Sequence, residues 1–247
     1  MDLQHDLIAF GILVGYYLAF AIPIAVISSL LSEPKREPIR KSYHIFASLS
    51  ILIILLFFST WYSALLSIVS ILILAFFLII ILEKFKAPPI KAVKRSSRRS
   101  EIPTQIIFIL IVLSVLIILF WGISGEGYRF IIAVGVMSWG FGDATSALVG
   151  KKYGRNRLHH FWFDGKKTLE GTLAGALAGT AGALIALLIF SPLPLIGKLI
   201  LSAFAGSISA LVEAFSRRGI DTLTVPLSVS ILSAPLFFLL NFLEGLF

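Results

Sequence analysis

Apolar residues along the chain gather into eight long runs, which short polar or charged segments separate. Each run has about 18–24 residues, the length that an α-helix needs to cross about 30 Å of hydrocarbon. Transmembrane β-strands would be shorter segments of alternating polarity, and the sequence has no such pattern. The pattern therefore predicts an all-α polytopic membrane protein with about eight transmembrane helices, at 8–31, 43–60, 63–82, 104–122, 130–150, 169–190, 195–215 and 222–242.

The composition supports this interpretation. Hydrophobic residues make up 58% of the chain, the mean hydropathy is +0.98, and only 14% of residues are charged. A water-soluble fold could not bury so much apolar surface, so a soluble enzyme, a nucleic-acid binder and a disordered chain are excluded. The absence of cysteine excludes thiolate metal sites and cysteine catalysis. The segment 1–6 carries two acids and no base, so we expect the first apolar run to be a retained helix rather than a secretory signal.

The basic residues predict the orientation. Nineteen of the 21 Lys and Arg residues lie in the segments that follow the first, third, fifth and seventh runs, and only Arg129 and Lys198 lie elsewhere. By the positive-inside rule these segments are cytoplasmic, which places both termini on the non-cytoplasmic side. Most of these bases need no role beyond orientation and contact with lipid headgroups.

The two halves of the single membrane domain, 1–247, differ in polarity. The first four spans, 1–122, are nearly pure apolar and suit a lipid groove or a scaffold, whereas polar residues enter the spans of 130–242. Ionisable groups in membrane helices are costly and are usually functional. Four acids lie near the predicted cytoplasmic ends of these later spans: Asp143, Glu170, Glu213 and Asp221.

Pairing with a neighbouring base is the simpler explanation for each acid. It suits Glu170, which follows Lys166 and Lys167, and it suits Asp143 least, because no base is near Asp143 in its own helix. Small residues recur at helical spacing around these acids, at 171, 175 and 179 and at 202, 206 and 209. Such stripes predict close helix packing, which would bring the acids together.

The segment from Gly165 to Gly171, with sequence GKKTLEG, is a candidate phosphate site. A helix that begins here offers unpaired N–H groups, beside two lysines and a threonine hydroxyl. The spacing of a Walker A loop is absent. Carboxylates beside a phosphate site favour Mg²⁺, and the adjacent His159 and His160 show no zinc spacing. These residues indicate phosphoryl or nucleotidyl transfer to a lipid at the cytoplasmic face.

Four sequence blocks resemble the family of dolichol kinases, phytol kinases and CTP-dependent diacylglycerol kinases. The block GDATSALVGKKYG at 142–154 is similar to the family's G-D block, and GKKTLEGT at 165–172 to its G-K block. The pair at 212–213 with DTLTVP at 221–226 resembles its V-E…D-N-x-T block, and RKSYH at 40–44 resembles an earlier R-K-x-x-H element. One departure is Thr222, where the family usually has Asn.

The resemblance implies a CTP-dependent polyprenol (dolichol-type) kinase, distantly similar to phosphatidate cytidylyltransferases. Its partners would be a nucleoside triphosphate, a lipid alcohol and membrane lipids, with no nucleic acid. It implies three sets of residues: catalytic Asp143, His44 and Glu170; phosphate-binding or nucleotide-binding Gly165, Lys166, Lys167, Thr168, Arg155 and Lys152; and Mg²⁺ ligands Asp143, Glu213 and Asp221. His44 is the candidate acceptor of the hydroxyl proton, although an interfacial histidine that binds a headgroup explains it equally simply.

Two other functions stay open. A phosphatidate cytidylyltransferase would use the same nucleotide and the same membrane setting. A transporter of an anionic solute would use an acid such as Asp143 within the membrane, but inverted repeats and polar groups at the bilayer midplane are typical of transporters. Here the halves differ in composition and the polar groups are expected at one face.

Overall fold

The computed structural model describes residues 3–30, 33–85, 102–158, 167–216 and 219–244. These residues are almost entirely helical, and the one β-bridge among them joins Arg157 to Thr168. The long helices are α1 (Leu3–Leu30), α2 (Glu33–Phe57), α3 (Trp61–Lys84), α5 (Ile102–Ile117), α6 (Phe130–Tyr153), α7 (Leu169–Phe190), α8 (Leu195–Phe215) and α9 (Asp221–Glu244). A π-helical segment, Ile118–Ile123, and a short 3₁₀ turn, Glu126–Tyr128, connect α5 to α6.

The predicted all-α membrane architecture is confirmed. Seven helices are long and apolar enough to cross a membrane, and the apolar part of the remaining helix, α2, is the shorter segment Lys41–Phe57. The predicted ranges of α7 and α8 agree with the structure to the residue. The largest difference is at α2, which begins at Glu33 rather than at residue 43. Its polar first turns continue the helix beyond its apolar part.

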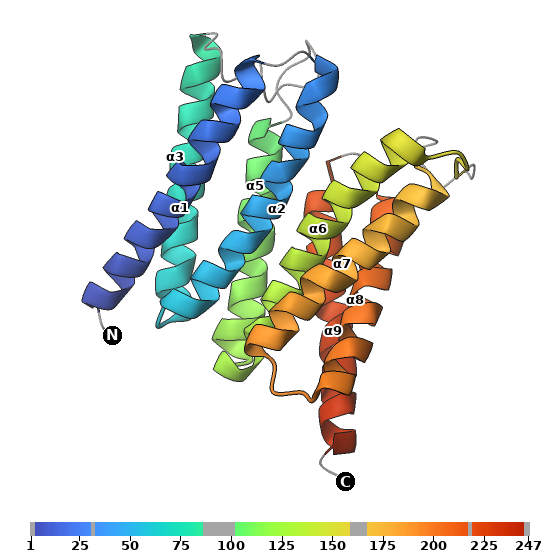
Figure 1. Ribbon diagram of the computed structural model, residues 1–247. Coiled ribbons are helices and arrows are strands. Elements are labelled where there is room, and N and C mark those ends of the chain that lie inside the picture. The colour runs from blue at the N-terminus through green and yellow to red at the C-terminus, as the bar shows by residue number, and fades with distance from the viewer. Residues whose placement is uncertain (1–2, 31–32, 86–101, 159–166, 217–218, 245–247) are drawn as a thin grey trace.

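The helix ends that adjoin the basic segments lie together at one end of the bundle. The last residues of α1, α3, α6 and α8 are at this end, with the first residues of α2, α5, α7 and α9, while α1 begins and α9 ends at the opposite end (Figure 1). This arrangement agrees with the predicted even number of crossings. The assignment of the basic end to the cytoplasm stays a prediction.

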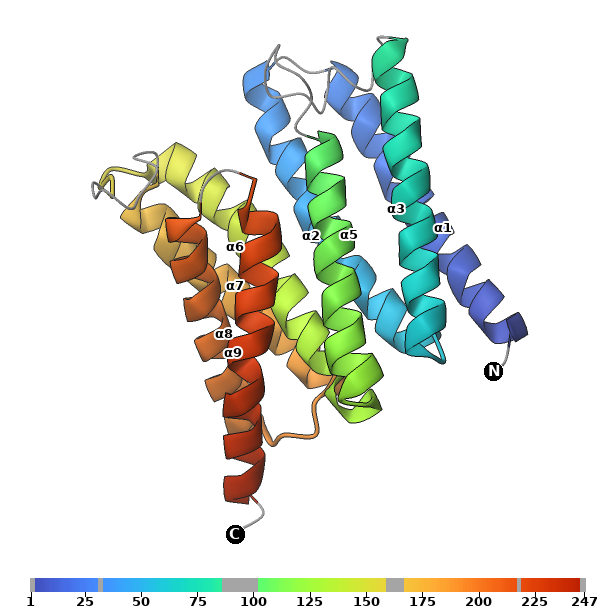
Figure 2. The same ribbon diagram turned by 180° about the vertical axis from the view of Figure 1, so that it is seen from behind.

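Helix α6 is the centre of the fold. It contacts α2, α5, α7, α8 and α9, and most of its length is buried. Helix α2 joins α6 to α1, and α3 packs against α5. Helix α5 in turn lies beside α9 when the bundle is seen from behind (Figure 2). A residue on α6 can therefore meet side chains from both halves of the chain.

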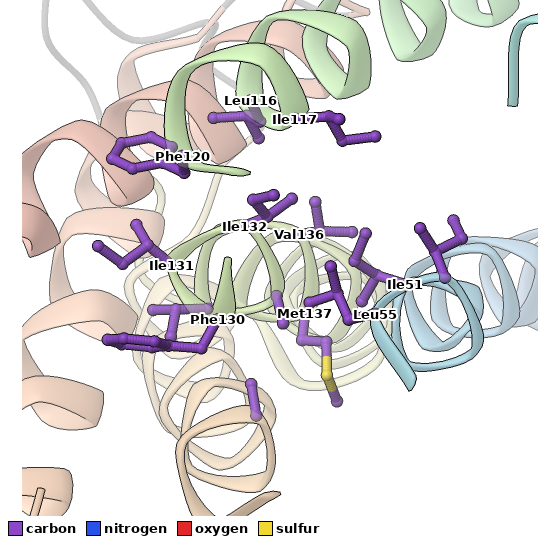
Figure 3. Packing of buried hydrophobic residues seen from close by; sticks show 14 of the residues in the cluster. Ile51, Leu55, Leu116, Ile117, Phe120, Phe130, Ile131, Ile132, Val136 and Met137 are labelled. Atoms are coloured by element: carbon purple, nitrogen blue, oxygen red, sulfur yellow. The ribbon is translucent and has the colours of Figure 1, made fainter. Parts of the chain in front are cut away.

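The hydrophobic core forms where α2, α5 and α6 meet. Figure 3 shows Ile51 and Leu55 of α2, Leu116 and Ile117 of α5, and Ile132 and Val136 of α6 gathered around one interior. All six residues are less than 5% exposed. Because lipid tails are as apolar as these side chains, their burial stabilises the bundle through van der Waals packing and not through transfer from water.

Glycines set the closest helix contacts of α6. A Cβ at Gly140 would lie 2.3 Å from Ser48 Cβ and 2.8 Å from the carbonyl oxygen of His44, so α2 approaches α6 at a distance that only glycine permits. On the side of α7, a Cβ at Gly171 would lie 2.7 Å from the carbonyl oxygen of Ser146. The packing role predicted for the small-residue stripe of α7 is thus confirmed. These contacts fix α2 and α7 against the segment of α6 that carries Asp143.

Candidate active site

Asp143 of α6 is held by a lysine from the first half of the chain. Lys41 Nζ lies 2.7 Å from Oδ1 and 2.8 Å from Oδ2 of Asp143. Both residues are buried, with 6% of Lys41 and 4% of Asp143 exposed. The sequence has no base near Asp143 within its own helix. In the structure the base is Lys41 of α2, which lies 102 positions away in the chain. The first four spans are therefore more than a scaffold, because α2 supplies the base that pairs with Asp143.

His44 lies on the same face of α2, three residues after Lys41. Its Nδ1 is 3.0 Å from Asp143 Oδ2, a close contact whose N–H direction does not meet the geometry of a good hydrogen bond. The structure thus brings together two residues that the sequence analysis named separately, as a histidine–carboxylate pair across the α2–α6 contact.

A second ion pair joins Lys167 to Glu213. Lys167 Nζ contacts Glu213 Oε1, and Ser146 Oγ donates to the same oxygen over 3.3 Å. Glu213 is 4% exposed, while Lys167 lies at the edge of the cluster. The pair connects the start of α7 to the end of α8, and Ser146 connects both to α6.

Asp221, in the first turn of α9, completes the cluster. It interacts electrostatically with Asp143, Lys41 and Lys167, and it accepts a 2.9 Å hydrogen bond from the N–H of Thr222. Within the described part of the chain, the two lysines face three carboxylates, since Glu213 also interacts with Asp143 and Asp221. The cluster therefore has a formal charge of −1 when the histidine is neutral, and this excess would attract a further cation.

At the predicted phosphate site, the start of α7, some of the backbone N–H groups already donate to other atoms of the protein. Thr168 is the N-cap of α7, and its Oγ1 accepts the N–H of Gly171 over 3.2 Å. The N–H of Leu169 donates to the carbonyl of Asn156 over 2.9 Å. These two backbone donors are not free for phosphate, whereas the ammonium of Lys167 lies directly before the N-cap of the helix. Gly165 and Lys166, the other predicted members, lie outside the described residues.

A polar pocket adjoins this helix start. It is an open depression of about 530 Å³, and its lining consists of Lys152, Tyr153, Gly154, Arg155, Asn156 and Glu170. Glu170 is at its rim, where Oε1 accepts 3.1 Å and 2.9 Å hydrogen bonds from the backbone N–H and the Nδ2 of Asn156. The structure places Glu170 in this pocket and not beside Asp143, whereas Arg155 and Lys152 are exposed at the same pocket.

The predicted Mg²⁺ ligands are near one another without forming a ready-made metal site. Among the residues that the structure describes, no three His, Cys, Asp or Glu side chains converge as metal ligands do. Their carboxylate oxygens suit Mg²⁺ chemically. However, Lys41 and His44 contact the oxygens of Asp143, and Lys167 contacts Glu213, so Asp221 is the predicted ligand whose carboxylate has no lysine or arginine contact among the described side chains. The Mg²⁺ site stays a prediction.

Comparisons with known proteins identify the family. The chain is 30% identical over 224 residues to a phytol kinase of Synechocystis sp., covering 90% of this chain and 88% of that protein. It is also 30% identical over 158 residues to a probable chloroplastic phytol kinase of Triticum aestivum, covering 60% of this chain and 49% of that protein. No family model and no solved structure matches the chain.

The match to the Synechocystis protein covers nearly the whole length of both chains, and so it includes the helices that carry Lys41, His44 and Asp143 as well as the later spans. The predicted family resemblance is confirmed, while the distant similarity to cytidylyltransferases is not shown. The chain belongs to the phytol kinase family and is a membrane kinase that phosphorylates an alcohol group on a lipid.

Proposed function

We propose that this protein transfers the terminal phosphoryl group of a nucleoside triphosphate, with CTP as the expected donor, to the hydroxyl of an isoprenoid alcohol. The two relatives are named for phytol, a branched alcohol of this class. The polyprenol that the sequence predicts has the same reacting group on a longer chain. The observation that carries the proposal is the contact of Lys41 and His44 with Asp143, because it joins a proton acceptor to a charged cluster within the membrane.

His44 is the proposed general base. As the hydroxyl oxygen bonds to the γ-phosphorus, the bond from that phosphorus to the bridging oxygen breaks and the nucleoside diphosphate leaves. The hydroxyl proton passes to Nε2 of His44, which requires that Nδ1 carry the other proton. Asp143 favours this tautomer because its Oδ2 lies 3.0 Å from Nδ1. General base catalysis of this kind contributes about 10²–10⁴-fold to a rate.

Lys167 is the proposed first contact of the triphosphate. It lies at the edge of the cluster and is paired with Glu213 in this structure. It precedes by three residues Glu170, which lines the same pocket as Arg155 and Lys152. A lysine ammonium can exchange a carboxylate for a phosphate oxygen at little cost, since both are anionic acceptors. Gly165, Lys166 and Thr168 stay in the proposed phosphate site on the basis of the sequence alone.

Mg²⁺ is the proposed cofactor. Asp221 and Glu213 would hold it, and the formal charge of −1 on the cluster supports a bound cation. The ion supplies neutralisation of the charge on the β- and γ-phosphates. Asp143 was also a candidate ligand, but its contacts with Lys41 and His44 support a role in orienting the histidine.

We infer that the reaction takes place at the cytoplasmic face. Lys167, Glu213 and Asp221 lie at helix ends next to the basic segments, and these ends gather at one end of the bundle (Figure 1). The positive-inside rule assigns such an end to the cytoplasm. Nucleoside triphosphates are available on that side. A lipid alcohol would reach the same cluster from the membrane.

A panel of substrates tests this proposal. Purified protein is incubated with Mg²⁺, one of four γ-labelled nucleoside triphosphates, and phytol, a polyprenol or diacylglycerol, and labelled lipid phosphate is measured. We expect labelled phytol or polyprenol, most rapidly with CTP, and little labelled diacylglycerol. Labelling of diacylglycerol alone would contradict the isoprenoid substrate, and equal rates with all four nucleotides would contradict the preference for CTP.

A further inference from the structure

Trp139 carries a buried donor without an acceptor. Its side chain is 5% exposed, and its Nε1 has no hydrogen-bond partner in the part of the chain that the structure describes. An unpaired buried N–H loses its hydration without compensation, so it destabilises the fold unless a ligand accepts from it. Most buried indole N–H groups find a partner. This one is therefore available for a ligand.

The indole ring that carries this unpaired donor lies beside the imidazole ring of the proposed base. The rings of Trp139 and His44 are 5.4 Å apart between centroids and tilted by 58°. Trp139 also precedes Asp143 by one helical turn on α6, which places it about 6 Å further along the axis from the basic end of the bundle. Trp139 thus lies deeper in the bundle than Asp143 and beside the ring of His44, whereas Lys167 approaches the cluster from the side of α7 and α8.

The contact between α2 and α6 changes from polar to apolar in the same direction. Lys41, His44 and Ser48 follow one another along α2, with Ser48 packed against Gly140. Further along the same face of α2, Ile51 and Leu55 pack toward the apolar side chains of α6 (Figure 3). A lipid alcohol also changes from polar to apolar along its length, because it has one hydroxyl at the end of a hydrocarbon chain.

We propose that Trp139 binds the hydroxyl oxygen of the lipid alcohol through its Nε1–H, and so positions the hydroxyl for His44. The oxygen accepts from Trp139 and its proton points to His44 Nε2. The indole ring contacts the first carbons of the chain. This inference rests on the proposed acceptor, a lipid alcohol, and adds to it the residue that holds the reacting group.

Binding of three matched ligands without nucleotide tests the role of Trp139. The ligands are phytol, its methyl ether and the corresponding hydrocarbon. The ether can accept from Trp139 but cannot donate to His44, and the hydrocarbon can do neither. Affinities for the wild type and for Trp139→Phe are measured in detergent micelles by native mass spectrometry. Trp121→Phe is the control, because Trp121 is also buried but lies in the π-helical segment after α5.

We expect Trp139→Phe to weaken binding of the alcohol and the ether by about 3- to 10-fold, the loss of one hydrogen bond, and to leave hydrocarbon binding within twofold. Trp121→Phe should bind all three ligands like the wild type. Unchanged ether binding in Trp139→Phe, or an equal loss for the hydrocarbon, would overturn the proposal. If Trp139→Phe does not fold, benzothienylalanine at position 139, which replaces N–H by sulfur, gives the same comparison.

The outcome is independent of catalysis. A wild-type protein that binds the alcohol through Trp139 but transfers no phosphoryl group would contradict the proposed function and retain the hydroxyl site. A protein that phosphorylates phytol, but whose affinity for the ether is the same in the wild type and in Trp139→Phe, would retain the proposed function and contradict the hydroxyl site. Steady-state kinetics give a second readout, in which Trp139→Phe raises KM for the alcohol and leaves KM for the nucleotide unchanged.

Discussion

Lys41 Nζ contacts both carboxylate oxygens of Asp143, at 2.7 Å and 2.8 Å, from a helix that lies 102 positions away in the chain. The pair couples the first half of the protein to the second. It also keeps a negative charge inside a membrane bundle, where an isolated carboxylate would be costly. Stability and activity should therefore depend on the same contact, and double variants can separate the two.

Lys41→Met leaves Asp143 buried without its cation. Breaking a buried ion pair in this way costs about 3–5 kcal/mol, so we expect a clear fall in thermal stability in detergent together with loss of turnover. Lys41→Met combined with Asp143→Leu removes both charges and should recover much of the stability without any turnover. Lys151→Met, at an exposed site, is the control. Full activity in the double variant would contradict a catalytic role for this pair.

Asp143→Asn tests the orientation of His44. The amide has one acceptor oxygen and no charge, so it holds neither Lys41 nor the productive histidine tautomer as the carboxylate does. We expect turnover to fall by at least about 100-fold, within the range of lost base catalysis, at normal expression. The measurement is lipid phosphorylation by membranes that contain equal amounts of each protein. Near-normal activity would show that Asp143 acts neither on His44 nor on a metal ion.

Lys167→Gln should weaken use of the nucleotide. Losing one charge-assisted contact with phosphate costs about 1.5–3 kcal/mol, which is roughly 10- to 150-fold in kcat/KM. Lys166→Gln should cost less, because Lys167 adjoins the N-cap of α7. Lys167→Arg should recover only part of the loss, since a planar guanidinium replaces a compact ammonium. The measurement is steady-state kinetics with varied nucleotide and saturating lipid. A kcat/KM within twofold of the wild type for both Gln variants would exclude this phosphate site.

The orientation can be tested by labelling, because the natural chain has no cysteine. Lys151→Cys, at the basic end of the bundle, should react with an impermeant thiol reagent only from the cytoplasm. Ser124→Cys, in the exposed turn before α6, should react only from outside. Reaction of both cysteines from the same side would refute the predicted topology.

Most of the fold could be predicted from apolar run lengths, because a helix must span a fixed hydrocarbon thickness. Helices α7 and α8 follow this rule to the residue. Helix α2 does not, since its charged first turns stay helical outside the apolar region and include Pro38. The π-helical segment after Ile117 is not predicted by run length, because its residues are as apolar as those of the α-helix before it.

The site was less predictable, for a physical reason. Motifs identified Asp143, Glu213 and Asp221 individually, but the partner of Asp143 depends on how α2 packs against α6. Gly140 permits that packing, and a glycine's contacts cannot be assigned from sequence alone. A buried acid is costly without a base beside it. A search of the basic residues of every other helix for a partner of Asp143 could therefore have identified Lys41.

The central claim is phosphoryl transfer from a nucleotide to an isoprenoid alcohol with His44 as base. Its most direct measurement follows phytol or a polyprenol with CTP labelled at either the γ- or the α-phosphate, using the wild type and His44→Phe. We predict that γ-label enters the lipid with release of CDP, that α-label does not, and that His44→Phe loses about 100-fold or more of the rate. Entry of α-label with release of pyrophosphate would show nucleotidyl transfer, and undiminished activity of His44→Phe would show that this histidine is not the base.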